Sequence, residues 1–201
     1  MELVTARPTE TETICSTLRP DSVQQDCLWW GAEQLMRTDA DLAAKVCGEL
    51  EGILAGECWF QLAEKQDQPT FCSQASPFVE DCQIHLLSRW LFRHPHTDWK
   101  EMTVRAEHYG IDPASKIGET VLYRHLVSVS QPMELSICAQ TANQGACLLA
   151  GSGVYRDRLR YAEEQHTFPC NIDNQHALFH NDHPTLQPIY QEFYEANCVS
   201  P

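Results

Sequence analysis

The sequence is poor in basic residues. It has 14 Lys and Arg against 28 Asp and Glu, which gives a formal net charge of −14 at pH 7 and an isoelectric point near 4.9. A protein that binds nucleic acid needs Lys and Arg to displace counterions from phosphates, so we expect no nucleic acid partner. Anionic membrane surfaces are disfavoured for the same reason. We expect the charge mainly to keep the protein soluble, and an acidic patch for a basic partner is the alternative.

Long apolar runs are also missing. No stretch reaches the roughly 18 apolar residues of a membrane-spanning helix. The N-terminus lacks the basic start and apolar segment of a signal peptide, so we interpret the chain as a mature form. Residues 1–14 are polar and rich in threonine. We predict that they form a flexible tether, which would attach the protein to the cell envelope; a full-length cytosolic protein is the alternative.

Closely spaced cysteines are absent, although the chain has 10 cysteines. Without C-x2-C pairs, the usual zinc, iron–sulfur and haem attachment motifs are excluded. An even number of well-separated cysteines favours disulfide bonds, and disulfide bonds persist in oxidising compartments. We therefore expect a secreted or periplasmic protein.

Helical periodicity runs through most of the chain, and strand signals are weak. We predict an all-α, disulfide-stapled multi-helix bundle, with residues 15–201 as a single helical domain. The alternative is two packed subdomains with a seam near residue 95. Asp21, Thr38 or Asp39, and Ser76 are expected near helix starts, with Pro77 at the first position of its helix. The expected helices cover residues 21–36, 38–65, 69–93 with a kink or restart at Pro77, 98–110, 112–127, 132–140, 146–165 and 184–198.

The stretch "CGELEGILAGEC", residues 47–58, has a glycine at every fourth position. If residues 40–65 and 69–93 form an antiparallel helical hairpin, Cys58 faces Cys72 and Cys47 faces Cys82. Helix axes usually lie about 8 to 10 Å apart, whereas bonded cysteines need Cα atoms about 5.5 Å apart. We therefore predict a ridge of small residues that lets the helices approach: Ala44, Gly48, Gly52 and Gly56.

Two alternatives to this hairpin stay open. In the first, "GELEG" breaks the helix and leaves Cys47 on a separate short segment. In the second, Cys72 and Cys82 form a local bond across Pro77. The other cysteines are paired only because this leaves short loops: Cys15 with Cys27, Cys138 with Cys147, and Cys170 with Cys198.

Residues 47–82 resemble the coiled-coil-helix-coiled-coil-helix motif, in which two helices each carry two cysteines about nine residues apart. Here the gaps between cysteines are ten and nine residues. The chain departs from that family in its glycines, in Pro77 and in its long second half. The resemblance implies a local disulfide hairpin and no activity.

A second resemblance covers residues 47–85, where "ECWFQLAE" is followed by "ASPFVEDC" and then His85. This sequence pattern is similar to that of cysteine-rich secreted bacterial helical proteins. It implies an exported, helical, disulfide-bonded protein, and it implies no activity.

Nine histidines are the main compositional hint of chemistry. The densest group is "HALFHNDH", where a helix over 174–181 would place His176 and His180 on one face. With His183 they could bind Zn(II) or Cu(II). The alternative is an exposed turn with ordinary surface histidines. His94 and His96 in "RHPH" fit a solvated connector as well as a metal site, and His85 fits a buried core histidine better than a ligand.

Catalytic motifs are missing. The sequence has no G-x-S-x-G, H-E-x-x-H, P-loop or G-x-G-x-x-G pattern, and "GSGVYRD" at residue 151 fits a packed helix better than a phosphate loop. Ten cysteines that can pair with one another make a catalytic thiolate improbable. The adjacent Trp29 and Trp30 point about 100° apart on a helix. Core packing explains them best, and an anchor for a protein or glycan partner is the alternative.

These observations favour an exported, non-enzymatic binding module, stabilised by disulfides, whose protein or glycan partner is unknown. The alternative is a periplasmic or extracellular metal-binding protein that uses the histidine cluster. The first expectation assigns no cofactor, and the second assigns Zn or Cu.

Overall fold

The structure is a computed structural model, and it describes residues 4, 7–128, 135–165 and 183–199. Every regular element in these ranges is a helix, so the chain has the all-α, disulfide-stapled fold expected from its periodicity. The contacts between elements divide the chain into two compact units. One comprises Met1–Arg89 with His108–Gly110, and the other comprises Trp90–Glu107 with Ile111–Pro201. The alternative seam expected from the sequence lies near residue 95.

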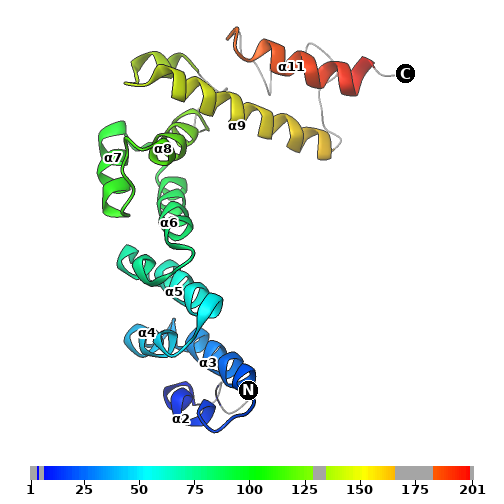
Figure 1. Cartoon of the computed structure of the whole chain (residues 1–201). Coiled ribbons are helices and arrows are strands. Elements are labelled where there is room, and N and C mark those ends of the chain that lie inside the picture. The colour runs from blue at the N-terminus through cyan, green and yellow to red at the C-terminus, as the bar shows by residue number, and fades with distance from the viewer. Residues whose placement is uncertain (1–3, 5–6, 129–134, 166–182, 200–201) are drawn as a thin grey trace. The chain divides into compact units, whose positions relative to one another are not determined.

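The first unit consists of short helices that follow one another along the chain (Figure 1). Helix α3 packs against α2, α4 and α5, and α5 also contacts η2. Buried apolar side chains of these helices, with cysteines among them, form one core. The elements are η1 (Pro8–Glu10), α2 (Thr11–Cys15), α3 (Asp21–Leu35), α4 (Ala40–Gly48), α5 (Gly52–Gln66), η2 (Pro69–Gln74) and most of α6 (Val79–Arg93).

The second unit is built on the contact of α8 with α9, and α9 also packs against η3 and α11. The ring of Trp99 in α7 stacks on Tyr123 of α8, with 4.9 Å between the ring centroids. A separate core contains Tyr123, Leu159 and other buried apolar side chains. The elements are the end of α6, then α7 (Trp99–His108), α8 (Lys116–Ser128), η3 (Leu135–Gln140), α9 (Gln144–Glu164), α11 (Gln187–Tyr194) and a π-helical turn, η4 (Glu195–Val199).

Several helix starts match their sequence signals. The Asp39 carboxylate accepts a hydrogen bond from the Leu42 amide and caps α4, and Asp98 does the same for Glu101 at the start of α7. Such a side chain satisfies one of the amide groups that a helix leaves without an internal partner. The restart near Pro77 is also present, but α6 begins at Val79 and not at Pro77. Its first main-chain bond joins the amide of Cys82 to the carbonyl of Phe78.

The continuous helix predicted over residues 38–65 is wrong. Helix α4 ends at Gly48 and α5 begins at Gly52, as the first alternative proposed. Gly52 adopts a φ of 57°, a left-handed conformation that residues with a Cβ rarely adopt. Gly56 lies against the Ser76 carbonyl, and a Cβ added to Gly56 would be 2.3 Å from that oxygen. The three glycines therefore differ: Gly48 is the last residue of α4, Gly52 adopts a left-handed φ at the start of α5, and Gly56 permits a close backbone contact.

The predicted hairpin bonds Cys47–Cys82 and Cys58–Cys72 are wrong for the same reason. The structure has Cys47–Cys58 and Cys72–Cys82, with Cα–Cα distances of 5.5 and 5.6 Å. In one unbroken helix, two residues eleven positions apart lie about 16 Å apart along the axis and cannot bond. The break between α4 and α5 removes this obstacle. Cys72–Cys82 is the local bond considered as the second alternative.

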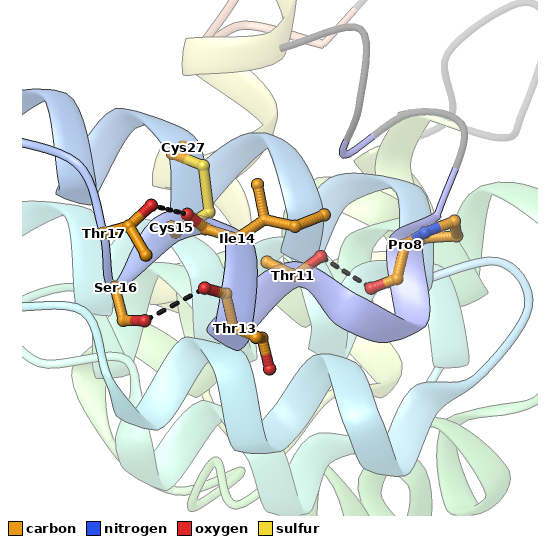
Figure 2. Close-up of a disulfide and its surroundings, with 8 residues drawn as sticks. All are labelled: Pro8, Thr11, Thr13, Ile14, Cys15, Ser16, Thr17 and Cys27. Atoms are coloured by element: carbon orange, nitrogen blue, oxygen red, sulfur yellow. Dashed lines mark hydrogen bonds between the residues drawn. A yellow bond between two sulfur atoms is a disulfide. The ribbon is translucent and has the colours of Figure 1, made fainter.

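The other short-loop pairs agree with the structure where it describes both cysteines. Cys15–Cys27 joins the end of α2 to α3, as Figure 2 shows, and Cys138–Cys147 joins η3 to α9. Cys198 is also disulfide-bonded. Cys170, its predicted partner, lies outside the part of the chain that the structure describes.

Part of the segment expected to be a flexible tether is helical. Residues 8–15 form η1 and α2, and the Thr11 side chain is buried against α3. Its hydroxyl donates a hydrogen bond to the Pro8 carbonyl at 2.6 Å (Figure 2). Val4 is buried in the core of the first unit. These residues therefore belong to the folded unit.

Among the helices of the described ranges, none is both long enough and apolar enough to cross a membrane.

Candidate interaction surface

Helix α3 buries one face and leaves the opposite face to solvent. Its buried side is formed by Cys27, Leu28, Gly31, Ala32 and Leu35. Since α-helical residues advance by about 100° each, Val23 and Trp30 lie together on the other side, one at i and one at i+7. Both are large apolar side chains with high exposure, 43% for Val23 and 44% for Trp30.

The two adjacent tryptophans have different environments. Trp29 packs against the core of the first unit, whereas Trp30 is exposed. Core packing therefore holds for Trp29, and Trp30 has the exposure that an anchor for a partner requires. Val23 falls at helical spacing with Cys27, Leu28 and Leu35, yet it is exposed. The missed signal was the Gly31-Ala32 pair, whose small side chains mark the face that packs.

The position of α3 is fixed by α2. A Cβ on Gly31 would lie 2.1 Å from the Thr11 methyl group, so the two helices touch at this glycine. A few residues away, the Cys15–Cys27 bond links the same helices covalently (Figure 2). A surface on a clamped helix loses little conformational entropy on binding.

Carboxylates border the apolar pair on α3. Asp26 is exposed and Glu33 half-buried, and neither forms an ion pair with any residue that the structure describes. We call Val23, Asp26, Trp30 and Glu33 the α3 face. It places an aromatic anchor, a residue type enriched in binding hot spots, beside a charged border of the kind found at interface rims.

The predicted metal ligands cannot be brought together from this structure. His176 and His180 lie outside the described residues. His183 is half-buried, and its Nδ1 accepts a hydrogen bond from the Thr185 amide at 3.3 Å. Within the described ranges, no group of three His, Cys, Asp or Glu side chains is placed to hold a metal ion. The histidine cluster therefore stays a prediction.

Two other histidines have structural contacts. The ring of His94 stacks on Trp90 with 4.4 Å between centroids, and its Nδ1 lies 2.8 Å from the Trp90 carbonyl oxygen at the end of α6. His85 is only half-buried, which differs from the buried core histidine favoured by the sequence. Its Nε2 lies 3.5 Å from a Glu64 carboxylate oxygen, which is paired with Arg89 at 3.0 Å.

Burial shifts the pKa values of three groups in the second unit. It lowers the pKa of His125 below 6.5, and the Nε2 of this residue is buried without a hydrogen-bond partner. It lowers the pKa of Arg158, which donates a hydrogen bond to the Ser128 carbonyl at 2.9 Å. Burial is the main reason why the pKa of Tyr155 is raised to about 12, and the electrostatic effect of the nearby Tyr190 adds to it. Tyr155 therefore stays protonated at neutral pH.

Comparisons of the chain with models of protein families, with curated proteins and with solved structures find no match. They therefore do not test the two resemblances noted in the sequence.

Proposed function

We propose that this chain is a non-enzymatic binding module of an oxidising compartment, secreted or periplasmic, and that the α3 face contacts its protein or glycan partner. The observation that carries the proposal is the exposure of Trp30 and Val23 on a helix held in place by a disulfide bond. Large aromatic side chains on a rigid support are typical binding anchors.

The disulfide bonds support the proposal of an oxidising compartment. Four bonds join cysteines that are fully or almost fully buried, and every cysteine in the described part of the chain is bonded. Such bonds are typical of proteins outside the reducing cytosol. Bonded cysteines also supply no thiolate nucleophile.

A photo-crosslinking amino acid at position 23 tests the binding surface. Expressed in its native host, this chain should give one defined adduct, and mass spectrometry of the adduct would identify the partner as protein or glycan. A second substitution, Trp30→Ala, should reduce the adduct severalfold, because the neighbouring anchor is lost. The same crosslinker at Glu57, which is exposed on α5, is the matched control.

Adducts that form equally from positions 23 and 57, or that persist after Trp30→Ala, would contradict a role for the α3 face. Cell fractionation tests the compartment separately. Recovery of the folded protein from the cytosol with its thiols reduced would contradict export.

A further inference from the structure

The end of α6 carries the most exposed large apolar side chain in the described part of the chain. Phe92 is 86% exposed, and the residues that follow it, Arg93, His94, Pro95 and His96, are exposed as well. We call Phe92, Arg93, His94 and His96 the α6 tip. A single exposed apolar residue is ordinary, but an aromatic beside an arginine has the composition of an interaction hot spot.

The base of the α6 tip is held in place. Trp90 is buried two residues before Phe92, and the Arg105 guanidinium of α7 lies 4.7 Å from the centroid of the Trp90 ring. His94 stacks on the same ring. These contacts fix the end of α6 against α7, so Phe92 projects from an ordered support.

The α6 tip lies in a stretch of sequence without acidic residues. Residues 82–97 contain no Asp or Glu, although the chain has 28 of them, and they include Arg89 and Arg93. Arg89 is paired with Glu64, whereas Arg93 forms no ion pair with a described residue. The α6 tip therefore presents an uncompensated positive charge beside an apolar ring.

The α3 face has the complementary composition. Its apolar Trp30 and Val23 match Phe92, and its carboxylates, Asp26 and Glu33, match the charge of Arg93. We propose that the α6 tip of one copy of this chain docks on the α3 face of a second copy. The inference rests on the proposed function, because it assigns a partner to the same α3 face.

This contact joins two different surfaces, so it is heterologous. Heterologous contacts build rings or open chains of subunits instead of stopping at a symmetric dimer. Two helix surfaces with one aromatic each bury less area than a standard protein–protein interface, which buries about 1,600 Å² in total. We therefore expect weak, concentration-dependent association. Charge complementarity makes it sensitive to salt.

Sedimentation velocity of the full oxidised chain at micromolar to millimolar concentration tests the proposal. The weight-average sedimentation coefficient should rise with concentration, and 0.5 M NaCl should weaken the association. Phe92→Ala and Trp30→Ala should each weaken it about tenfold. Leu149→Ala is the matched control, because Leu149 is 74% exposed on α9 but belongs to neither surface.

A charge exchange provides the sharper measurement. Arg93→Glu and Asp26→Lys should each weaken association alone, because each places like charges together, and an equimolar mixture of the two variants should associate again. A chain that stays monomeric throughout, or one whose association is unchanged by all four substitutions, would overturn the inference. A monomer that still gives the position-23 adduct with a different molecule would leave the proposed function intact.

Discussion

The helical glycines of this protein differ in the atoms that lie against them. Gly56, Gly31 and Gly48 are all helical, yet a Cβ on Gly56 would meet a backbone oxygen, one on Gly31 would meet the Thr11 side chain, and one on Gly48 would meet nothing within 4 Å. The cost of adding a methyl group therefore differs at each site. Helix propensity alone predicts a gain of about 1 kcal/mol for each substitution by alanine.

Gly56→Ala should destabilise the protein by about 1 to 3 kcal/mol, because the new methyl group would overlap the Ser76 carbonyl and force the backbone apart. The measurement is the free energy of unfolding from urea titration of the oxidised chain. Gly48→Ala is the matched control and should be neutral or stabilising by up to about 1 kcal/mol. Equal effects at both positions would contradict the close contact between Gly56 and Ser76.

His125 should make stability depend on pH. Burial lowers its pKa below 6.5 in the folded chain, so the unfolded chain binds a proton at a higher pH than the folded chain does. The free energy of unfolding therefore decreases as the pH falls from 6.5, the pKa in the unfolded chain, through the lower pKa of His125 in the folded chain. Urea titrations at several pH values between 7.5 and 5 should show a smaller loss of stability for His125→Gln than for the wild type.

His96→Gln is the control for this measurement, because His96 is exposed. This variant should keep the pH dependence of the wild type. If His125→Gln kept it too, protonation of the buried imidazole would not be its cause.

At the scale of elements, each of the four disulfide bonds whose two cysteines are described joins a short helix to the helix that follows it. The four bonds link cysteines 9 to 12 positions apart in the sequence. In two of them both cysteines lie in α-helices, and in the other two the first cysteine lies in a 3-10 helix. The bonds therefore fix individual helix connections.

Digestion with trypsin, without reduction, should separate the observed bonds from the hairpin bonds. Cleavage after Lys45, Lys65 and Arg89 gives one peptide with Cys47 and Cys58 and a second with Cys72 and Cys82. The structure predicts two unlinked peptides, each lighter by 2 mass units than after reduction because each contains one internal bond. A single species in which the two peptides are linked would show the hairpin pairing instead.

At the scale of the whole molecule, the chain forms two compact units, each with its own core. Cys138–Cys147 lies within the second unit, where it clamps η3 to the first turn of α9. The other three bonds between described cysteines lie within the first unit. Removing one bond should therefore affect the unit that contains it.

The double variant Cys138→Ser/Cys147→Ser should destabilise the second unit by about 3 kcal/mol, the chain-entropy value for a loop of this length. Hydrogen exchange followed by mass spectrometry should show faster amide exchange in η3 and α9, with α3, α4 and α5 unchanged. An equal increase in both sets of helices would show that the bond does not act locally.

Local patterns in the sequence were enough to predict the helical class, the starts of several helices and the presence of disulfide bonds. These properties are local, because apolar periodicity, an aspartate cap and the number and spacing of cysteines are all read within a few turns of chain. The criterion that bonded cysteines enclose a short loop also predicted the bonds Cys15–Cys27 and Cys138–Cys147. The exposed member of the tryptophan pair was anticipated only as an alternative.

Packing between helices sets which cysteines bond in residues 47–82 and which face of α3 reaches solvent. Glycines at every fourth position fit both a ridge on a continuous helix and a chain reversal, and the choice depends on the left-handed φ of Gly52 and on the backbone opposite Gly56. Val23 likewise fits the apolar period of α3, but α2 packs on the side of Gly31 and leaves Val23 exposed. Contacts between segments distant in the sequence settle both questions, and a local pattern does not contain them.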